Sequence, residues 1–270
     1  MSKMKERALQ RWSLQGKTAL VTGASKGIGR AIAEELAQLG ACVYVCARSE
    51  NDLKQRLQEW KDAGLPISGC ICDVSLHSSR EQLMVEVSKH FEGKLDILVN
   101  NAATIGQTMG ILDVPFDDMS LTLRTNFESA VHLSRLAHPL LKATGAGNIV
   151  LISSIAGSHA MGLVACMYHC TKGALNQLTR NLAFEWAKDG IRVNAIAPGY
   201  VWTDMFNKMG DERRNFIATR IPLRRFGEGS EIAATVAFLC MPCSAYTTDN
   251  VGSDVDKVDE VLEMNFDDFS

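Results

Sequence analysis

The sequence predicts an α/β fold of the Rossmann type, in which helices cover both faces of a doubly wound parallel sheet. Short apolar runs rich in β-branched residues alternate with segments of helical periodicity from residue 17 to about residue 240. A glycine-rich turn joins the first strand to the first helix, and no segment rich in proline or serine divides the chain. We therefore expect a single domain over residues 12–248, followed by an acidic tail over residues 249–270 in place of the last strand.

The composition indicates a globular protein with a small-molecule ligand. The chain has 270 residues, of which 46% are hydrophobic and 22% are charged, and this is enough for one sizeable core. The net charge of -3 gives no basic excess, so we expect neither nucleic acid nor an anionic membrane as a partner. No apolar run has the length of a membrane span or the pattern of a signal peptide, so we expect a cytoplasmic protein.

The eight cysteines fall in close pairs, and we expect them to be reduced and to fill apolar space. Only Cys240-Met-Pro-Cys243 has the spacing of a metal-binding pair. A tetrahedral zinc site of this kind needs a second pair, so we predict no metal site.

The first predicted strand, residues 17–22, leads into the turn Gly23-Ala-Ser-Lys-Gly-Ile-Gly29 and then into a helix. Glycine has no Cβ, so the backbone can turn sharply and approach a pyrophosphate closely, while N–H groups at the helix start face the anion. The spacing differs from that of the general dinucleotide fingerprint, and the alternative is an ordinary strand-to-helix turn. We expect cofactor binding by Gly23, Ser25, Lys26, Gly27, Ile28 and Gly29.

The end of the second strand, residues 41–48, indicates which dinucleotide binds. A carboxylate at this point usually binds the ribose 2′-hydroxyl of NAD, whereas a guanidinium suits the 2′-phosphate of NADP. The chain has Arg48-Ser49 here and Lys26 in the glycine turn. The alternative is that both cations are solvated surface residues. We predict NADPH/NADP+ as the cofactor, bound in part by Lys26, Arg48 and Ser49.

The third and fourth strands also end in polar residues. The third, residues 67–72, ends in Asp73-Val74, where the acid suits a hydrogen bond to adenine and equally suits capping of the next helix. The fourth, residues 95–99, ends in Asn100-Asn-Ala-Ala103, whose two amides suit bridging of neighbouring loops. The candidates for cofactor binding here are Asp73, Val74, Asn100 and Ala102.

A helix predicted from about residue 120 to residue 141 contains Asn126. Asparagine is a poor residue inside a helix because its side chain competes for backbone groups. Two interpretations are equally good: a kink at Asn126 that binds water, or an exposed helical asparagine without a role.

The fifth strand, residues 148–152, ends in Ser153-Ser154, and a helix begins near Tyr168. Tyr168 and Lys172 are four residues apart, so they project from one face of that helix. A Tyr-x-x-x-Lys pair alone is usually a surface pair. Here the pair follows a serine at a strand end and a nucleotide-binding turn, and this context favours a catalytic role for the pair.

The sixth strand, residues 191–197, runs into a proline and a glycine, and Thr203 beyond them suits binding of a carboxamide. Residues 200–226 are irregular and mix aromatic side chains with charges, which suits a flap over a moderately apolar substrate. Ser230 is expected to cap the last helix. The cofactor candidates in this part are Pro198, Gly199, Val201 and Thr203.

Together these motifs resemble the short-chain dehydrogenase/reductase family, in family order and over roughly residues 12–245. The matching motifs are Thr22-Gly-Ala-Ser-Lys-Gly-Ile-Gly29, Asn100-Asn-Ala102, Asn126, Ser154, Tyr168-x-x-x-Lys172 and Pro198-Gly199. Three further segments are similar to the plant tropinone-reductase-like members: Arg11-Trp-Ser-Leu-Gln-Gly16, Cys46-Ala-Arg48 and Leu182-Ala-Phe-Glu-Trp-Ala187. The resemblance implies NADPH-dependent reduction of the ketone of a small, moderately apolar, alkaloid-like substrate to a secondary alcohol.

The resemblance also implies roles for Asn126, Ser154, Tyr168 and Lys172 in catalysis. Tyr168 would give a proton to the ketone oxygen as NADPH delivers hydride. Lys172 would lower the pKa of Tyr168 and hold the ribose hydroxyls, so this pair also counts among the cofactor-binding residues. Ser154 would bind the substrate oxygen, and Asn126 would support a water that relays protons toward Lys172.

Two positions depart mildly from the family pattern. Ala103 stands where glycine is common. Ser154 and Tyr168 are one residue further apart than usual, so either the loop between them bulges or Ser153 binds the substrate oxygen. We favour the bulge.

A more serious departure follows Tyr246-Thr-Thr, where the family has an apolar strand and this chain becomes acidic. Unpaired acids are costly to bury, so we expect residues after about Asn250 not to form the seventh strand. That would expose a sheet edge and weaken the homodimer or homotetramer that the resemblance implies.

Two alternative functions remain open. Arginines between residues 213 and 225 suit the docking of an acidic carrier protein, as in a β-ketoacyl carrier-protein reductase, although a solvated helical surface explains them better. The abnormal carboxyl end suits a catalytically weak NADP(H)-binding protein. The intact Ser154, Tyr168 and Lys172 argue against this second alternative.

Overall fold

The computed structural model describes residues 9–160, 165–203 and 210–253. Within them a parallel seven-stranded sheet has the order β3-β2-β1-β4-β5-β6-β7. The strands are β1 (Thr18–Thr22), β2 (Cys42–Ala47), β3 (Ile67–Ile71), β4 (Ile97–Asn100), β5 (Gly147–Ile152), β6 (Ile191–Ala197) and β7 (Val251–Ser253). The strand order reverses between β1 and β4, so the predicted doubly wound α/β sheet is confirmed.

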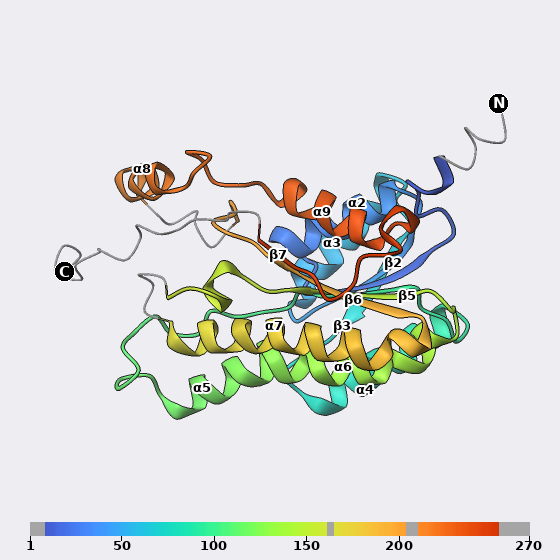
Figure 1. The fold of residues 1–270 in the computed structure, drawn as a ribbon, viewed down its shortest axis with the longest axis horizontal. Helices are drawn as coiled ribbons and strands as arrows, with labels where there is room; N and C mark the ends of the chain where they lie inside the picture. Colours follow the sequence, from blue (N-terminus) through green and yellow to red (C-terminus); the bar gives the residue numbers. More distant parts are fainter. Residues whose placement is uncertain (1–8, 161–164, 204–209, 254–270) are drawn as a thin grey trace.

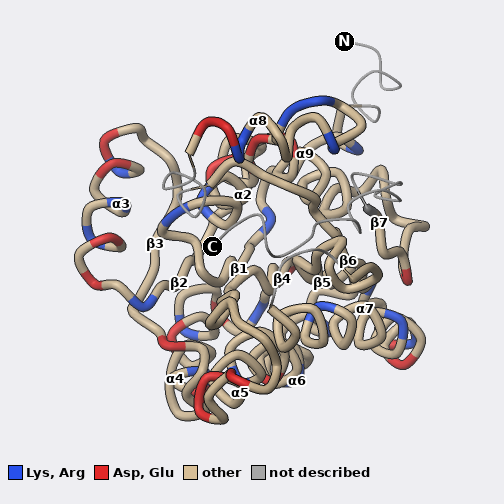
Figure 2. Tube along the Cα trace, turned by 90° about the vertical axis from the view of Figure 1, so that its left-hand side faces the viewer, with Lys and Arg blue, Asp and Glu red and all other residues tan. Residues whose placement is uncertain are grey.

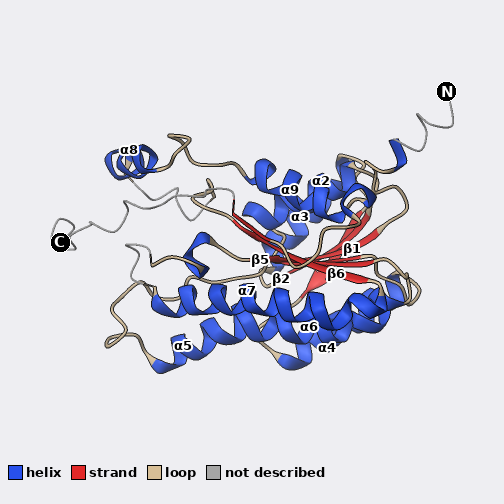
Figure 3. Cartoon of the chain, in the orientation of Figure 1, coloured by secondary structure: helices blue, strands red, loops and turns tan. Residues whose placement is uncertain are grey.

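Helices cover both faces of this sheet (Figures 1 and 3). One face carries α2 (Gly27–Gln38), α3 (Glu50–Asp62) and α9 (Gly229–Cys240), and the other carries α4 (His77–His90), α6 (Ser129–Lys142) and α7 (Cys166–Trp186). The remaining helical segments are α5 (Phe116–Leu123), a π-helical turn (Arg124–Glu128), α8 (Asp211–Arg220) and the 3-10 turns Ile155–Gly157, Ala187–Asp189 and Pro242–Ser244. None of the helices in the described ranges has the length and apolarity that crossing a membrane requires.

Successive residues of the central strands pack into separate cores on the two faces, because side chains alternate along a strand. Val21 packs with Ile32 of α2 and Val236 of α9 on one face, whereas Leu20 packs with Leu133 of α6 on the other. All of these side chains are fully or almost fully buried. The charged residues therefore lie mainly on the outer helices, as Figure 2 shows in a view onto the end of the sheet that faces α8.

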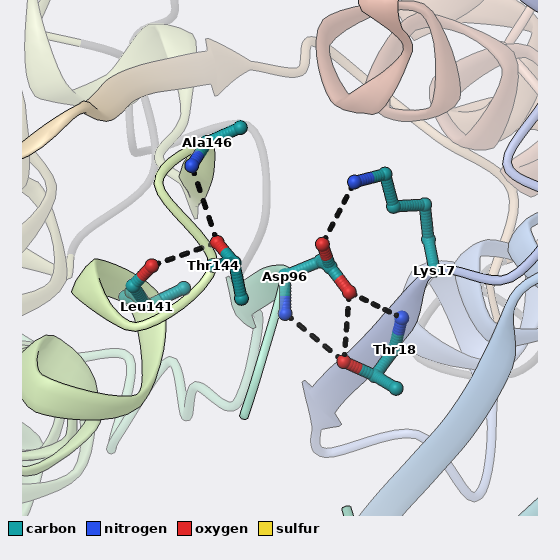
Figure 4. Close-up of polar contacts among 6 residues, drawn as sticks. All are labelled: Lys17, Thr18, Asp96, Leu141, Thr144 and Ala146. Atoms are coloured by element: carbon teal, nitrogen blue, oxygen red, sulfur yellow. Dashed lines mark hydrogen bonds and ion pairs between the residues drawn. The ribbon is translucent and has the colours of Figure 1, made fainter. Parts of the chain in front are cut away.

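One carboxylate joins the amino ends of the neighbouring strands β1 and β4 (Figure 4). Asp96 accepts hydrogen bonds from Lys17 Nζ at 2.8 Å and from both the N–H and the hydroxyl of Thr18 at 3.0 Å. The Asp96 N–H donates to Thr18 Oγ1 at 3.0 Å. The Asp96 side chain is only 14% exposed, so these charge-assisted bonds are partly shielded from water.

The prediction that residues after about Asn250 do not form the seventh strand is wrong. Val251–Ser253 form β7, which pairs in parallel with residues 195–197 of β6. The strand is three residues long and carries no charge, so it covers the edge of β6 without burying an acid. The sheet therefore continues past residue 248, and the reason for expecting a weakened oligomer no longer holds. Residues 254–270 of the predicted tail lie outside the described residues.

The start of α9 also differs from the prediction. Glu228, not Ser230, is the N-cap residue, and it forms a capping box with Glu231. The Glu228 N–H donates to Glu231 Oε2 at 2.8 Å. A longer carboxylate side chain thus performs the capping that the sequence pattern assigned to the serine two residues later.

Replacing Asp96 by alanine is expected to lower the free energy of unfolding by about 2–3 kcal/mol, because the Thr18 N–H and the Lys17 ammonium lose a charged partner. Urea unfolding followed by circular dichroism measures this change. Asp62→Ala, which removes an exposed carboxylate of α3, is the control and should stay within about 0.5 kcal/mol of the unchanged protein. Equal unfolding midpoints for the two variants would contradict the role of Asp96.

Candidate cofactor-binding and catalytic site

A cavity of about 670 Å³ opens at the carboxyl ends of the strands, beside the point where the strand order reverses. Ligands of doubly wound folds bind at this position. The cavity brings together segments that are far apart in the sequence, from the glycine turn to the loop after β6. The predicted residues that line it are Gly23, Ser25, Lys26, Gly27, Ile28, Gly29, Arg48, Ser49, Val74, Ala102, Ser154, Tyr168, Lys172, Pro198, Gly199, Val201 and Thr203.

The glycine turn packs closely against the loop after β4. Asn101 Nδ2 donates to Thr22 O at 2.8 Å and to Gly23 O at 3.1 Å. A Cβ on Gly29 would overlap Asn101 Nδ2 and lie 2.5 Å from Gly23 O. Gly23 has a φ of +66°, and a Cβ there would lie 2.8 Å from the Cα of Ala102. Both glycines are therefore required by the close approach of the backbone and of the Asn101 side chain.

The amino end of α2 faces this cavity and suits the phosphates of a dinucleotide. Lys26 is the N-cap residue, and no side chain among the described residues caps the helix. The first N–H groups of α2 are consequently free of a side-chain cap, and the first turn contains no acid that would repel an anion. The cavity fits a dinucleotide on these grounds.

The exposed side chains of Lys26 and Arg48 line the same cavity, together with Ser49. Ser49 Oγ accepts a hydrogen bond from the Asp52 N–H at 3.3 Å and so caps α3. Asp52 also lines the cavity, a contact that the sequence did not indicate. Lys26 and Arg48 outnumber the acid Asp52, so this part of the cavity wall carries a net positive charge, which suits the additional phosphate of NADP.

Asp73 and Asn100 do not line the cavity, although both were predicted to bind the cofactor. Asp73 Oδ1 accepts hydrogen bonds from the N–H and hydroxyl of Ser75 at 2.9 and 2.7 Å, and Leu76, not Asp73, is the N-cap residue of α4. Asn100 Nδ2 points toward α6, where it donates to Ser134 Oγ at 3.1 Å. Asn101 therefore makes the bridging contacts that were expected of both amides.

Tyr168 and Lys172 lie in the first two turns of α7. Lys172 is 3% exposed, its Nζ donates to Ile152 O at 2.7 Å, and it lies 5.5 Å from the centroid of the Tyr168 ring. Burial lowers the pKa of Lys172 to about 8. Burial raises the pKa of Tyr168 above its usual value, and a hydrogen bond with Ser154 offsets only part of this increase. The lowering of the Tyr168 pKa that the resemblance implies is not seen here, because desolvation outweighs the hydrogen bond with Ser154.

Ser153 and Ser154 both line the cavity, but the hydroxyl of Ser154 is the less tightly engaged of the two. Ser153 Oγ lies 2.5 Å from Asn176 Oδ1 and 3.0 Å from Lys172 O, so its proton is engaged within α7. Ser154 Oγ accepts from the Ala156 N–H at 3.2 Å, donates a long bond of 3.5 Å to Pro198 O and contacts the Tyr168 hydroxyl. The predicted bulge between Ser154 and Tyr168 falls partly on residues 161–164, outside the described residues.

Asn126 lies in the π-helical turn between α5 and α6 and is 2% exposed. It exchanges two hydrogen bonds of 2.8 Å with the backbone of Thr104, and its Nδ2 also donates to Thr171 Oγ1 at 3.2 Å. An exposed helical asparagine is therefore excluded. The side chain ties the loop after β4 to α7, beside Lys172. Thr104 and Thr171 were missed, because no pattern in the sequence marks a threonine as a hydrogen-bond partner.

A family model described as enoyl-(acyl carrier protein) reductase matches residues 23–254. The chain belongs to the short-chain dehydrogenase/reductase family. This family member is 52% identical over 240 residues to a tropinone reductase homologue of Arabidopsis thaliana, which covers 88% of this chain and 90% of the relative. It is 51% identical over 239 residues to senescence-associated protein 13 of the same plant, covering 88% of each. The resemblance to the family and to its plant tropinone-reductase-like members is confirmed, and the protein is an oxidoreductase of this family.

Solved structures of the family share the fold. A gluconate 5-dehydrogenase from Burkholderia cenocepacia J2315, in complex with NADP and tartrate, has a TM-score of 0.84 at 28% identity and covers 91% of this chain and 96% of its own. A variant of actinorhodin polyketide ketoreductase with NADPH has a TM-score of 0.82 at 31% identity, with coverage of 91% and 97%.

The buried position of Lys172 predicts a specific dependence of stability on pH. Its pKa falls from an ordinary value of 10.5 to about 8, so the folded state disfavours the ammonium. Below about pH 8 Lys172 is protonated in both the folded and the unfolded state, so the full free-energy cost of burying its ammonium lowers the stability of the folded state. Between about 8 and 10.5 the unfolded chain binds more protons than the folded one, so stability rises with pH, by up to about 3 kcal/mol.

Urea unfolding of the unchanged protein and of Lys172→Met over this pH range measures the effect. The variant lacks the titrating amine but shares every cysteine and tyrosine, so the difference in unfolding free energy between the two should grow in favour of the unchanged protein as pH rises. A constant difference across the range would show that Lys172 titrates normally.

Proposed function

We propose that the protein is an NADP(H)-dependent reductase that converts the ketone of a small, moderately apolar substrate into a secondary alcohol. The observation that carries the proposal is the convergence of Tyr168, Lys172 and Ser154 on a cavity whose far wall is the uncapped end of α2. NADP(H) is supported by the cations Lys26 and Arg48 in the cavity wall. Further support comes from the two structural relatives, which hold NADP and NADPH.

Several residues of this chain have separate roles in the proposed reduction. NADPH, when bound, supplies the hydride. The Tyr168 hydroxyl gives its proton to the ketone oxygen, and its raised pKa keeps that proton in place at neutral pH until transfer. Ser154 hydrogen-bonds the same oxygen. Lys172 would hold the ribose hydroxyls of the bound cofactor, and Asn126, whose amide holds Thr104, is proposed to support a water that returns protons toward Lys172.

A second cavity of about 270 Å³ suits the substrate's apolar part. It shares Ile155, Gly199, Tyr200 and Val201 with the first cavity, and Ile221 is among its apolar walls. The shared walls let one ligand extend from the reacting carbonyl into a mainly apolar space, which Arg220, Arg225 and Glu231 also line. The names of the plant relatives suggest a cyclic ketone that carries an amine, such as tropinone.

A β-ketoacyl carrier-protein reductase is the second candidate, since the matching family model is named for an acyl-carrier-protein substrate. Arg225, one of the arginines that suggested a carrier dock, forms two hydrogen bonds of 2.6 and 2.7 Å with Glu231. This pair reduces the local positive charge and favours the free ketone. The catalytically weak protein loses its main argument, because β7 completes the sheet. A homodimer or homotetramer remains a prediction.

Assays of NADPH oxidation with free cyclic ketones and with a β-ketoacyl carrier-protein thioester separate the two candidates. We expect kcat/KM for the best free ketone to exceed that for the carrier-linked substrate by at least about tenfold, which corresponds to about 1.4 kcal/mol in transition-state binding. A preference for the carrier-linked substrate would favour the second candidate. If neither kind of substrate supports NADPH oxidation, the proposal that the protein is a reductase is wrong.

Replacing Tyr168 by phenylalanine is expected to lower kcat by a factor of about 100 to 10,000, because the ring remains but the proton donor is lost. The dissociation constant for NADPH, measured by fluorescence titration, should change by less than about threefold. Tyr246→Phe removes the hydroxyl of a fully exposed tyrosine and should leave both values unchanged. Turnover by Tyr168→Phe close to that of Tyr246→Phe would refute the role of Tyr168.

A further inference from the structure

Two imidazoles and a carboxylate meet where α4 lies against α6, on residues that do not line either cavity described above. His77 and Glu81 are one turn apart on α4, and His132 belongs to α6. One possible ligand atom from each residue lies within 4.8 Å of those of the other two. His77 Nδ1 is 3.5 Å from a Glu81 carboxylate oxygen, and the His77 and His132 rings stack with centroids 4.0 Å apart.

We propose that His77, Glu81 and His132 bind one divalent transition-metal ion of the zinc class. Two imidazole nitrogens and one carboxylate oxygen form a donor set that zinc and its neighbours in the first row prefer. The donor atoms lie at most 4.8 Å apart, and turning one imidazole out of the stack would let both rings direct an in-plane nitrogen at a common ion about 2 Å away. His77 and Glu81 are 63% and 53% exposed in their side chains, so an ion can reach the site from solvent.

An ordinary helix contact explains this cluster less well. A histidine that only packs between helices usually has its buried ring nitrogen hydrogen-bonded. The Nδ1 atom of His132 is buried, yet it has no hydrogen-bond partner within the described part of the chain. The ring therefore lies against a second imidazole and near a carboxylate without a structural hydrogen bond at that nitrogen.

The nearest buried cation does not rule out a metal ion here. Arg80, on α4 between the two proposed ligands of that helix, is completely buried, and its guanidinium pairs with Glu128 at 2.7 Å. The half-exposed carboxylate of Glu128 pairs with Nη2 of Arg80, while Nε and Nη1 have no hydrogen-bond partner within the described residues, and Glu81 offers its own negative charge to the ion. An ion at the site would cross-link α4 to α6 beside the existing contact between Arg80 and Glu128.

Metal binding can be measured directly on the full chain, prepared without a polyhistidine tag and stripped with EDTA. Exposed Cys166 and Cys170 on α7 offer a competing thiol site, so the experiment uses a Cys166→Ser, Cys170→Ser background. Isothermal titration with zinc chloride should show one ion bound per chain, and zinc should raise the melting temperature. Glu81→Gln and His132→Gln should each weaken zinc binding at least tenfold.

The matched control is His159→Gln, which removes an exposed histidine elsewhere and should leave zinc affinity unchanged. If His132→Gln does not fold, the exposed ligand His77 is replaced by glutamine instead, with the same expected loss. The proposal is overturned if the protein does not bind zinc. It is also overturned if zinc affinity is unchanged in the Glu81 variant and in the histidine variant that folds. Because the readout is zinc binding and not NADPH oxidation, this result does not depend on the proposed function.

Discussion

The close packing of the glycine turn against the loop after β4 is the constraint on which the site depends. The hydroxyl oxygen of Thr22 accepts hydrogen bonds from the N–H groups of Asn101 and Ala102 at 3.0 Å each, while the Asn101 side chain returns a bond to Thr22 O. Asp96 ties the same two strands at their other end. β1 and β4 are therefore fixed to each other at both ends, and the cavity opens from a rigid junction. Such rigidity favours precise placement of a dinucleotide, since little ordering remains to be done on binding.

Burial, more than mutual attraction, controls the electrostatics of the Tyr168 and Lys172 pair. The long helix α7 is anchored by Leu175 and Leu182 in the core, and it holds Lys172 against the end of β5. Desolvation opposes the charged form of each group, so it favours a neutral phenol and an amine that loses its proton easily. A protonated phenol suits reduction, in which a proton is given to the product oxygen. In the reverse direction the same burial opposes formation of the phenolate.

Much of this arrangement could be predicted from the sequence, because buried parallel strands and glycine turns have strong patterns. β6 has the predicted bounds, and the residues at strand ends meet because parallel strands end at one edge. The sequence could not indicate which of Asn100 and Asn101 faces the glycine turn, since neighbouring residues at a strand end point in opposite directions. β7 was missed because three uncharged residues are too few to form a pattern beside an acidic segment, and pairing with β6 decides their structure. The proposed metal ligands come from two helices and meet only through tertiary packing.

The π-helical turn between α5 and α6 links these separate features. A π-helical turn is rare because it shifts the helical register, and it persists where neighbouring contacts compensate for it. Asn126 turns toward the loop after β4 and α7, whereas Glu128, two residues later, turns toward Arg80 on α4. The Arg80 and Glu128 pair contacts the turn from α4, whereas Asn126 contacts α7 and the loop after β4. Asn126 beside α7 and the half-exposed Glu128 beside Arg80 thus lie two residues apart in one π-helical turn, and α4, which carries Arg80, also carries two of the three proposed metal ligands.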